Sequence, residues 1–150
     1  DAMNEAYCSL LKQKLDIWQS KHGKFDVVVG CETEGIRIGY VLSKLIALPF
    51  YIMPKKSTDF AEVTIPPYPV DTHWLIVDDI VTTGSTYVRA VNFLDIEEKP
   101  ESITFACMIK RNPANMDYSA VHGDPDKEQF HVRDERFDFI DKRLVALHSE

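Results

Sequence analysis

Short apolar runs alternate along this chain with segments of helical periodicity, and this alternation constrains the fold more than any other feature. Four runs are suited to buried strands: residues 25–31, 49–53, 73–77 and 102–109. Between the first two, Ile38, Leu42 and Leu45 repeat at helical spacing, and a further helical segment covers about residues 85–97. Strands separated by helices predict right-handed crossovers between parallel strands. We therefore predict an α/β fold, an open doubly wound parallel sheet with helices on both faces.

The whole chain, residues 1–150, is interpreted as one domain with three parts. Apolar side chains that recur about every fourth residue predict an N-terminal helix over residues 1–22. The core of the domain covers about residues 25–113. Residues from about 114 to 150 are less regular, and we interpret them as a small C-terminal cap or edge of the same domain, with candidate strands near residues 129–132 and 136–140.

Composition and charge restrict the class of protein. Of the 150 residues, 45% are hydrophobic and 27% are charged, as in ordinary globular domains. The net charge of −7 argues against general binding to nucleic acid or to an anionic membrane, because both require a basic face. The longest apolar run, residues 45–53, is about half as long as a membrane-spanning helix. Three cysteines without a C-x-x-C pair predict neither a disulfide framework nor a zinc ribbon. We expect a soluble, cytoplasmic protein.

The segment from Trp74 to Thr86 carries the most specific chemical signal. A buried strand ends in two adjacent carboxylates, Asp78 and Asp79, and a hydroxyl-rich turn containing Gly84 leads into a helix. The unpaired N–H groups at a helix start stabilise a phosphate, and glycine lets the backbone approach it. Two carboxylates beside a phosphate require a partner such as a sugar diol or Mg²⁺. The alternative is that the carboxylates only cap a turn.

This segment resembles the 5-phosphoribosyl-1-pyrophosphate (PRPP) binding motif of type I phosphoribosyltransferases, and the resemblance extends over about residues 25–113. It implies that Asp78 and Asp79 are catalytic, contact the ribose hydroxyls and hold Mg²⁺, directly or indirectly. The loop for the 5′-phosphate would comprise Thr82, Thr83, Gly84, Ser85 and Thr86. The turn for the pyrophosphate would comprise Glu32, Thr33, Glu34 and Gly35. A plain strand-to-helix connection is the alternative for that turn.

A lysine pair follows the second predicted strand. Lys55 and Lys56 lie at the expected ligand edge of an acidic protein, and we expect them to help bind the pyrophosphate, because phosphates near several carboxylates require local cations. The alternative is an ordinary solvated surface pair. Residues 57–72 take the place of the mobile loop of the family, and they contain no Lys, Arg or His. This departs from the orotate-using members, in which a loop lysine assists catalysis.

A second basic tract follows the fourth predicted strand. Lys110, Arg111 and Pro113 resemble the Lys-Arg-x-Pro tract of hypoxanthine-guanine members, and the resemblance implies that Lys110 binds an exocyclic oxygen of the base. A basic strand end that contacts only water is the alternative. Thr82 stands where those enzymes commonly have an aspartate, and threonine is no comparable proton acceptor.

The resemblance as a whole implies a phosphoribosyltransferase. Such an enzyme transfers the 5-phosphoribosyl group of PRPP to a nucleobase, here with a purine favoured, and releases pyrophosphate to leave a nucleoside 5′-monophosphate. Mg²⁺ would be its cofactor, PRPP and a nucleobase its small-molecule partners, and a homodimer its expected assembly, without nucleic acid or membrane. The alternative is a non-catalytic or regulatory protein of the same fold that binds PRPP or a nucleotide.

Overall fold

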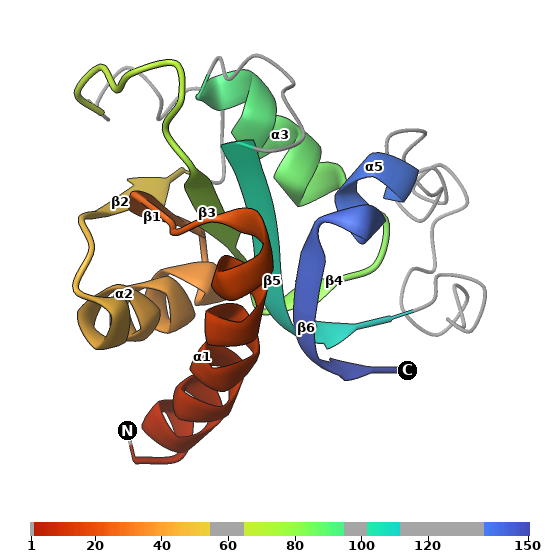
Figure 1. The fold of residues 1–150 in the computed structure, drawn as a ribbon. Coiled ribbons are helices and arrows are strands. Elements are labelled where there is room, and N and C mark those ends of the chain that lie inside the picture. The colour runs from red at the N-terminus through yellow and green to blue at the C-terminus, as the bar shows by residue number, and fades with distance from the viewer. Residues whose placement is uncertain (1, 55–64, 95–101, 112–136) are drawn as a thin grey trace, which may run out of the picture.

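The computed structural model describes residues 2–54, 65–94, 102–111 and 137–150. Its strands are β1 (Val27–Cys31), β2 (Phe50–Met53), β3 (Trp74–Val77), β4 (Ile80–Val81), β5 (Ile103–Lys110) and β6 (Leu144–Ser149). Its helices are α1 (Ala2–His22), α2 (Glu34–Ile46), α3 (Ser85–Phe93) and α5 (Phe137–Lys142). The strands form one sheet in the order β2-β1-β3-β5-β4, with β6 on the other side of β5, and all the pairings are parallel (Figure 1).

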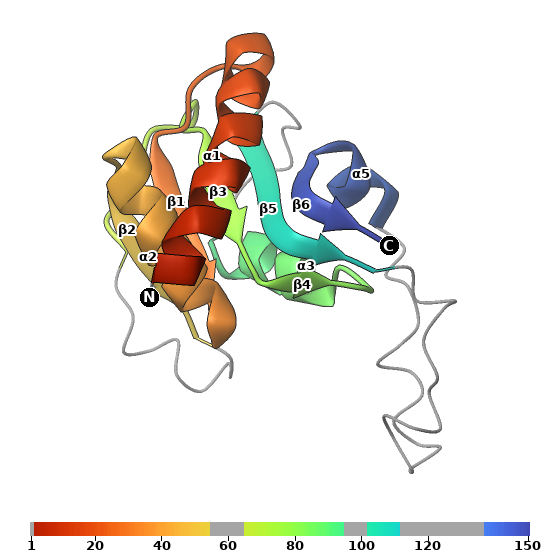
Figure 2. The same ribbon diagram turned by 90° about the horizontal axis from the view of Figure 1, so that it is seen from below.

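Helices cover both faces of this sheet. On one face, Leu11 of α1 and Leu42 of α2 pack against Leu75 of β3 in one buried cluster. On the other face, Tyr87 of α3 stacks at an angle on Phe105 of β5, with 4.8 Å between the ring centroids. Figures 1 and 2 show α1 and α3 on opposite sides of the strands. The predicted open, doubly wound parallel sheet is therefore confirmed.

The central strands are apolar throughout because both of their faces are buried. All five residues of β1 and all four of β3 are buried. Helix α1 buries Cys8, Leu11 and Leu15, which recur at helical spacing, and it ends where Gly23 takes a φ of +98° and donates its N–H to the carbonyl of Gln19. The predicted strands over residues 25–31, 49–53, 73–77 and 102–109 and the predicted N-terminal helix are confirmed within one to three residues.

Strand β5 bends, and its two halves have different neighbours. Residues 103–106 pair with β3, whereas Ile109 and Lys110 pair with the short strand β4. Strand β6 follows the opposite side of β5 from Phe105 to Lys110. The bend lets the chain cross from β3 to β4 around Asp79, whose carbonyl accepts the N–H groups of Met108 and Ile109.

The C-terminal region differs in part from the prediction. Residues 137–142 form helix α5, so the strand predicted over residues 136–140 is wrong there, and its Ile140 is buried against the core. Residues 144–149 join the main sheet as β6. The other candidate strand, residues 129–132, and the last residues of the predicted helix over 85–97 lie outside the described residues. No helix in the described part of the chain is long and apolar enough to cross a membrane.

Candidate active site

The turn after β1 and the diacid after β3 lie in contact at the carboxyl edge of the sheet. The parallel register places Gly30 beside Val77, so both strands end at the same level. Gly35, in the first turn of α2, packs so closely on β3 that an added Cβ would lie 2.6 Å from the carbonyl oxygen of Val77 and 3.3 Å from Oδ1 of Asp78. The structure therefore brings together the two segments that the sequence predicts to bind pyrophosphate and ribose.

The turn after β1 leads directly into helix α2. The Glu32–Thr33 peptide bond is cis, and the N–H of Glu32 donates to the carbonyl of Met53 at the end of β2. Thr33 and Glu34 are exposed, and Thr33 makes no side-chain hydrogen bond that caps α2 within the described residues. The N-terminal end of this 13-residue helix is thus available for an anion.

The two carboxylates of the diacid have different environments. Asp78 is only 8% exposed, and its Oδ1 accepts the N–H of Asp79 at 2.9 Å. Burial, together with a hydrogen bond that protonated Asp78 donates to the carboxylate of Asp79, raises the pKa of Asp78 to about 8. Asp79 is half-buried, and its Oδ1 accepts the N–H of Ile80 at 2.8 Å. One carboxyl is therefore held inside the protein, and the other lies at the surface of the edge.

The predicted phosphate loop surrounds a small cavity at the start of α3. This cavity has a volume of about 60 Å³ and is lined by Asp78 and residues 80–87. Gly84 has a φ of +80°, which favours glycine, and the Oγ1 of Thr83 accepts the N–H of Ser85 and lies 3.1 Å from its hydroxyl. Hydroxyl groups and helix N–H groups around a cavity of this size form a suitable cradle for one tetrahedral anion.

Three buried side chains that can form hydrogen bonds lie near Asp78, and the sequence analysis did not predict them. The sheet register places Cys31, Asp78 and Cys107 in a row across β1, β3 and β5. Tyr87 lies on this face, fully buried, and donates its hydroxyl to the carbonyl of Ala106 at 2.6 Å. Burial raises the pKa of both thiols and of the phenol, so all three stay neutral. The position of Tyr87 in the first turn of the helix that follows the loop is the feature of the sequence that could have indicated this group.

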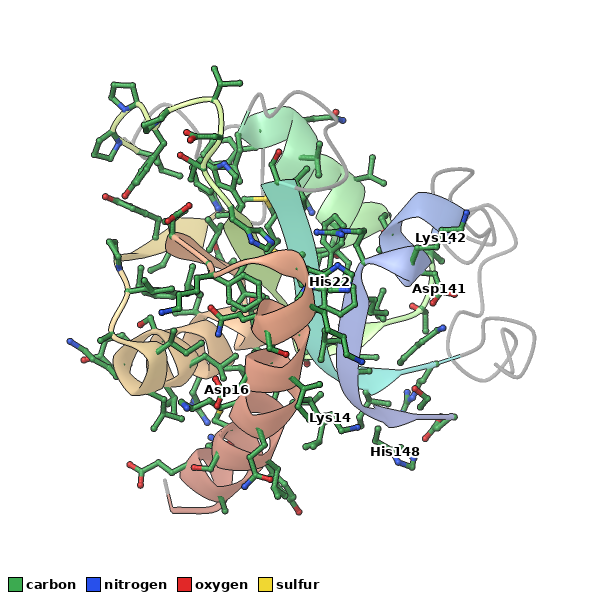
Figure 3. The ribbon with its side chains drawn as sticks, in the orientation of Figure 1. Lys14, Asp16, His22, Asp141, Lys142 and His148 are labelled. Atoms are coloured by element: carbon green, nitrogen blue, oxygen red, sulfur yellow. The ribbon has the colours of Figure 1, made fainter. Side chains whose placement is uncertain are left out.

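Lys110 lies apart from the cavity beside the diacid. Its Nζ is ion-paired with Asp141 of α5, and both residues line a groove of about 470 Å³ between α1 and β6. Figure 3 labels Asp141 together with Lys14 and His22, which contribute to the same groove from α1. Lys110 is not among the residues that line the cavity of the phosphate loop. Lys55 and Lys56 lie outside the described residues, as does the first part of the predicted mobile loop.

Comparison with known proteins identifies the family. The model of the phosphoribosyl transferase domain matches residues 9–133, which is most of the chain. The chain therefore belongs to the phosphoribosyl transferase domain family, and the resemblance stated from the motif is confirmed. A search of curated proteins finds no match.

Solved structures of this class have the same fold. A purine phosphoribosyltransferase from Pyrococcus horikoshii Ot3 is 24% identical, with a TM-score of 0.53 and 71% of each chain covered. An APRTase from Giardia lamblia, complexed with 9-deazaadenine, is 16% identical, with a TM-score of 0.57, covering 95% of this chain and 79% of the other. An orotate phosphoribosyltransferase from Aeropyrum pernix is 16% identical, with a TM-score of 0.55, covering 95% and 71%. At these identities the likeness shows the fold alone.

Proposed function

We propose that the protein is an active phosphoribosyltransferase, which transfers the 5-phosphoribosyl group of PRPP to a ring nitrogen of a nucleobase and releases pyrophosphate. The observation that most supports this proposal is the close packing of Gly35 on Asp78. It places the turn of residues 32–35 next to the diacid and next to a cavity of the size of a phosphate group. Three neighbouring subsites at one sheet edge match a ligand with a 5′-phosphate, a ribose and a pyrophosphate. In open α/β sheets, ligands bind at this edge.

The phosphate loop would bind the 5′-phosphate of PRPP. The N–H groups at the start of α3 and the hydroxyls of Thr82, Thr83, Ser85 and Thr86 supply donors around the cavity. The turn of Glu32, Thr33, Glu34 and Gly35 would bind the pyrophosphate through its amides. Lys55 and Lys56 belong to this proposal as additional cations, on sequence grounds. PRPP would thus be held at its 5′-phosphate and at its pyrophosphate. This orients the bond between the ribose and the pyrophosphate, which is the bond that breaks.

The diacid would hold the ribose while positive charge develops at its C1 atom. The surface carboxylate of Asp79 can accept hydroxyl groups and oppose the developing charge, and the buried Asp78 stands behind it. The residues present fit Mg²⁺, an ion usually held by one or two carboxylates and completed by water and substrate oxygens. Groups of three ligating side chains are absent among the described residues, in keeping with that mode of binding. Bound Mg²⁺ would neutralise the charge of the departing pyrophosphate.

A purine is the proposed base, on the strength of Lys110 and Arg111. The structural neighbours include a purine phosphoribosyltransferase, an APRTase and an orotate phosphoribosyltransferase, and so they favour no single base. The ion pair of Lys110 with Asp141 means that an exocyclic base oxygen would have to compete with a carboxylate for this amine. Thr82 supplies a hydroxyl but no base for proton transfer, so the nucleobase would lose its proton to another acceptor.

The direct test is incubation of the protein with PRPP, Mg²⁺ and a pool of nucleobases, with nucleotides and pyrophosphate quantified by mass spectrometry. We expect one nucleoside 5′-monophosphate to accumulate together with an equal amount of pyrophosphate. The second candidate function is a PRPP sensor, which Thr82 and the absence of basic residues from positions 57–72 favour. Binding of PRPP without product from any base supports that second function. A folded protein that does not bind PRPP contradicts both.

A further inference from the structure

Arg89 joins helix α3 to the end of strand β2. It lies one helical turn after Ser85 and is half-buried. Its Nη2 donates a hydrogen bond to the carbonyl oxygen of Pro54 at 3.2 Å, and Pro54 is the buried residue that follows β2. Arg89 therefore connects the helix that begins at the phosphate loop with the strand end that precedes Lys55 and Lys56.

The charge of Arg89 also acts on the two neighbouring strand ends. It lowers the pKa of the Asp78 carboxyl and of the Cys31 thiol, in both cases against a larger and opposite effect of burial. Asp78 follows β3 and Cys31 ends β1, and the sheet order places β2, β1 and β3 side by side. One guanidinium thus binds the end of one strand and acts by its charge on the ends of the two strands beside it.

A guanidinium suits this position for two physical reasons. It stays charged at every working pH, and its planar fork holds a fixed geometry that an ammonium group does not. The surrounding edge is acidic, because Glu32, Glu34 and the diacid all lie there. A fixed cation among them reduces the repulsion that a polyphosphate ligand meets on entering the site.

We propose that Arg89 is a positioning residue for PRPP. It holds the end of β2, where the Met53 carbonyl accepts the N–H of Glu32 in the turn proposed for the pyrophosphate, at a fixed distance from the phosphate loop. Its charge also offsets that of the acidic edge of the sheet. This inference rests on the proposed function. Arg89 acts through Pro54 and through α3, without touching the reacting atoms. A misplacement of about 1 Å in a site of this kind costs about 100-fold in rate. Loss of the Arg89 guanidinium is therefore expected to weaken the binding of PRPP and to leave the KM for the nucleobase unchanged.

The test compares the wild type with Arg89→Met, Arg89→Lys and Arg89→Ala. Asn92→Ala, an exposed position on the same helix, is the matched control. Kinetics in saturating Mg²⁺ separate the KM for PRPP from the KM for the base, and calorimetry measures the affinity for PRPP. We expect Arg89→Met to raise both the KM and the Kd for PRPP by about 10- to 100-fold, with Arg89→Lys between it and the wild type. The KM for the base stays within about twofold of the wild-type value in the Arg89 variants. All the constants of Asn92→Ala stay within the same range.

Chemical rescue distinguishes a positioning role of the Arg89 guanidinium from a role of the Arg89 side chain in the packing of α3. Ethylguanidinium in the buffer is expected to restore PRPP binding in Arg89→Ala, whereas ethylammonium restores much less. A wild-type Kd for PRPP in Arg89→Met overturns the proposal, as does an equal rise in both KM values without rescue. If thermal unfolding shows that Arg89→Met is not folded, Arg89→Lys decides, and an unchanged Kd for PRPP in that variant overturns the proposal. A wild type that does not bind PRPP instead overturns the proposed function, before any variant is compared.

Discussion

Two adjacent aspartates of identical chemistry acquire different properties from their surroundings. Asp78 continues the buried face of β3 and lies in a row with two thiols, so burial raises its pKa to about 8. Asp79 is half-buried, and its carbonyl accepts the N–H groups of Met108 and Ile109 of β5. The two neighbouring carboxyl groups therefore differ in burial, and only the more exposed one is proposed to contact the ligand.

Substitution of either aspartate is expected to reduce turnover without unfolding the protein. Asp79→Asn keeps the size of the side chain but removes the carboxylate proposed to oppose positive charge on the ribose, whereas Asp78→Asn removes the buried carboxyl behind it. We expect kcat to fall by about 100- to 1,000-fold in each variant. The thermal midpoint of Asp78→Asn is expected to stay near that of the wild type, because burial already favours the neutral form of Asp78.

Asp16→Asn is the control for these variants, because this exposed carboxylate pairs only with Lys12 on α1 among the interactions described. Its kinetics should equal those of the wild type. Unchanged activity in both diacid variants would mean that the two carboxylates are only turn caps.

Lys110 tests the proposed preference for purines. If its amine donates to an exocyclic oxygen of the base, Lys110→Ala lowers kcat/KM for 6-oxopurines by about 10- to 100-fold and leaves the affinity for PRPP unchanged. Lys142→Ala, an exposed lysine on α5, is the control. Equal losses for all bases, or a loss of PRPP binding alone, would contradict a role in base recognition and leave the ion pair with Asp141 as the function of Lys110.

At the scale of elements, the close packing of α2 on the sheet defines the site. Gly30 and Gly39 let β1, α2 and the ring of Phe50 approach closely, and Gly35 lets the first turn of α2 lie against the end of β3. A side chain at Gly35 would separate the turn after β1 from the diacid after β3. The distance between the turn of residues 32–35 and the diacid therefore depends on how α2 packs against the sheet, and not on the conformation of the turn alone.

Gly35→Ala is expected to reduce both stability and PRPP binding. Its Cβ would meet the carbonyl oxygen of Val77, a backbone atom that cannot easily move, so the helix must shift from Asp78. We expect a loss of about 1–3 kcal/mol in the free energy of unfolding and at least about a tenfold rise in the Kd for PRPP.

Gly39→Ala provides the matched control, because its Cβ would meet the ring of Phe50 at 2.8 Å, away from the diacid. Chemical denaturation and calorimetry on both variants separate the two effects. A similar rise in the Kd for PRPP in Gly39→Ala would contradict a specific role for the contact between Gly35 and Asp78.

At the scale of the whole molecule, the sheet forms a core between two helical layers, and ligand binding and folding are thermodynamically linked. PRPP that binds only the folded state stabilises the protein by about 2.7 kcal/mol at a hundred times its Kd. For a chain of 150 residues, this corresponds to a rise of roughly 5–10 °C in the thermal midpoint. Thermal unfolding with and without millimolar PRPP and Mg²⁺ measures it, and pyrophosphate alone should give a smaller rise. The absence of any shift would contradict both PRPP-binding functions.

Stability of the ligand-free protein is expected to depend on pH through His73. This side chain is buried, its Nε2 is hydrogen-bonded with Thr104, and burial together with the nearby charge of Arg143 lowers its pKa below 6.5. The unfolded chain therefore binds a proton below about pH 6.5 that the folded protein does not bind. The free energy of unfolding should fall as the pH decreases through that range, with a slope of up to about 1.4 kcal/mol per pH unit.

Urea unfolding at several pH values between 7.5 and 5 tests this dependence, with His73→Gln as the comparison. The slope should be smaller in the variant, because glutamine does not titrate. Equal slopes in both proteins would assign the pH dependence to other groups.

The sequence by itself determined the class of fold and predicted where the candidate site lies. Apolar periodicity and turn residues are local signals, so the strands over residues 25–31 and 73–77 and the start of the helix predicted over about residues 85–97 could be assigned without tertiary information. Parallel strands end at one edge, and the contact of Gly35 with Asp78 agrees with that inference. The sequence also pointed to the family through the string from Trp74 to Thr86.

Only the tertiary structure decided the features that depend on contacts between distant segments. The apolar residues at 137, 139 and 140 fit either a strand or a helical turn, and the burial of Ile140 in the core accompanies the helix. The partner of Lys110, and the bond from Arg89 to a carbonyl 35 residues earlier, follow from how the sheet and helices pack. Such partners are selected by proximity in the folded chain, which no local pattern of residue types encodes.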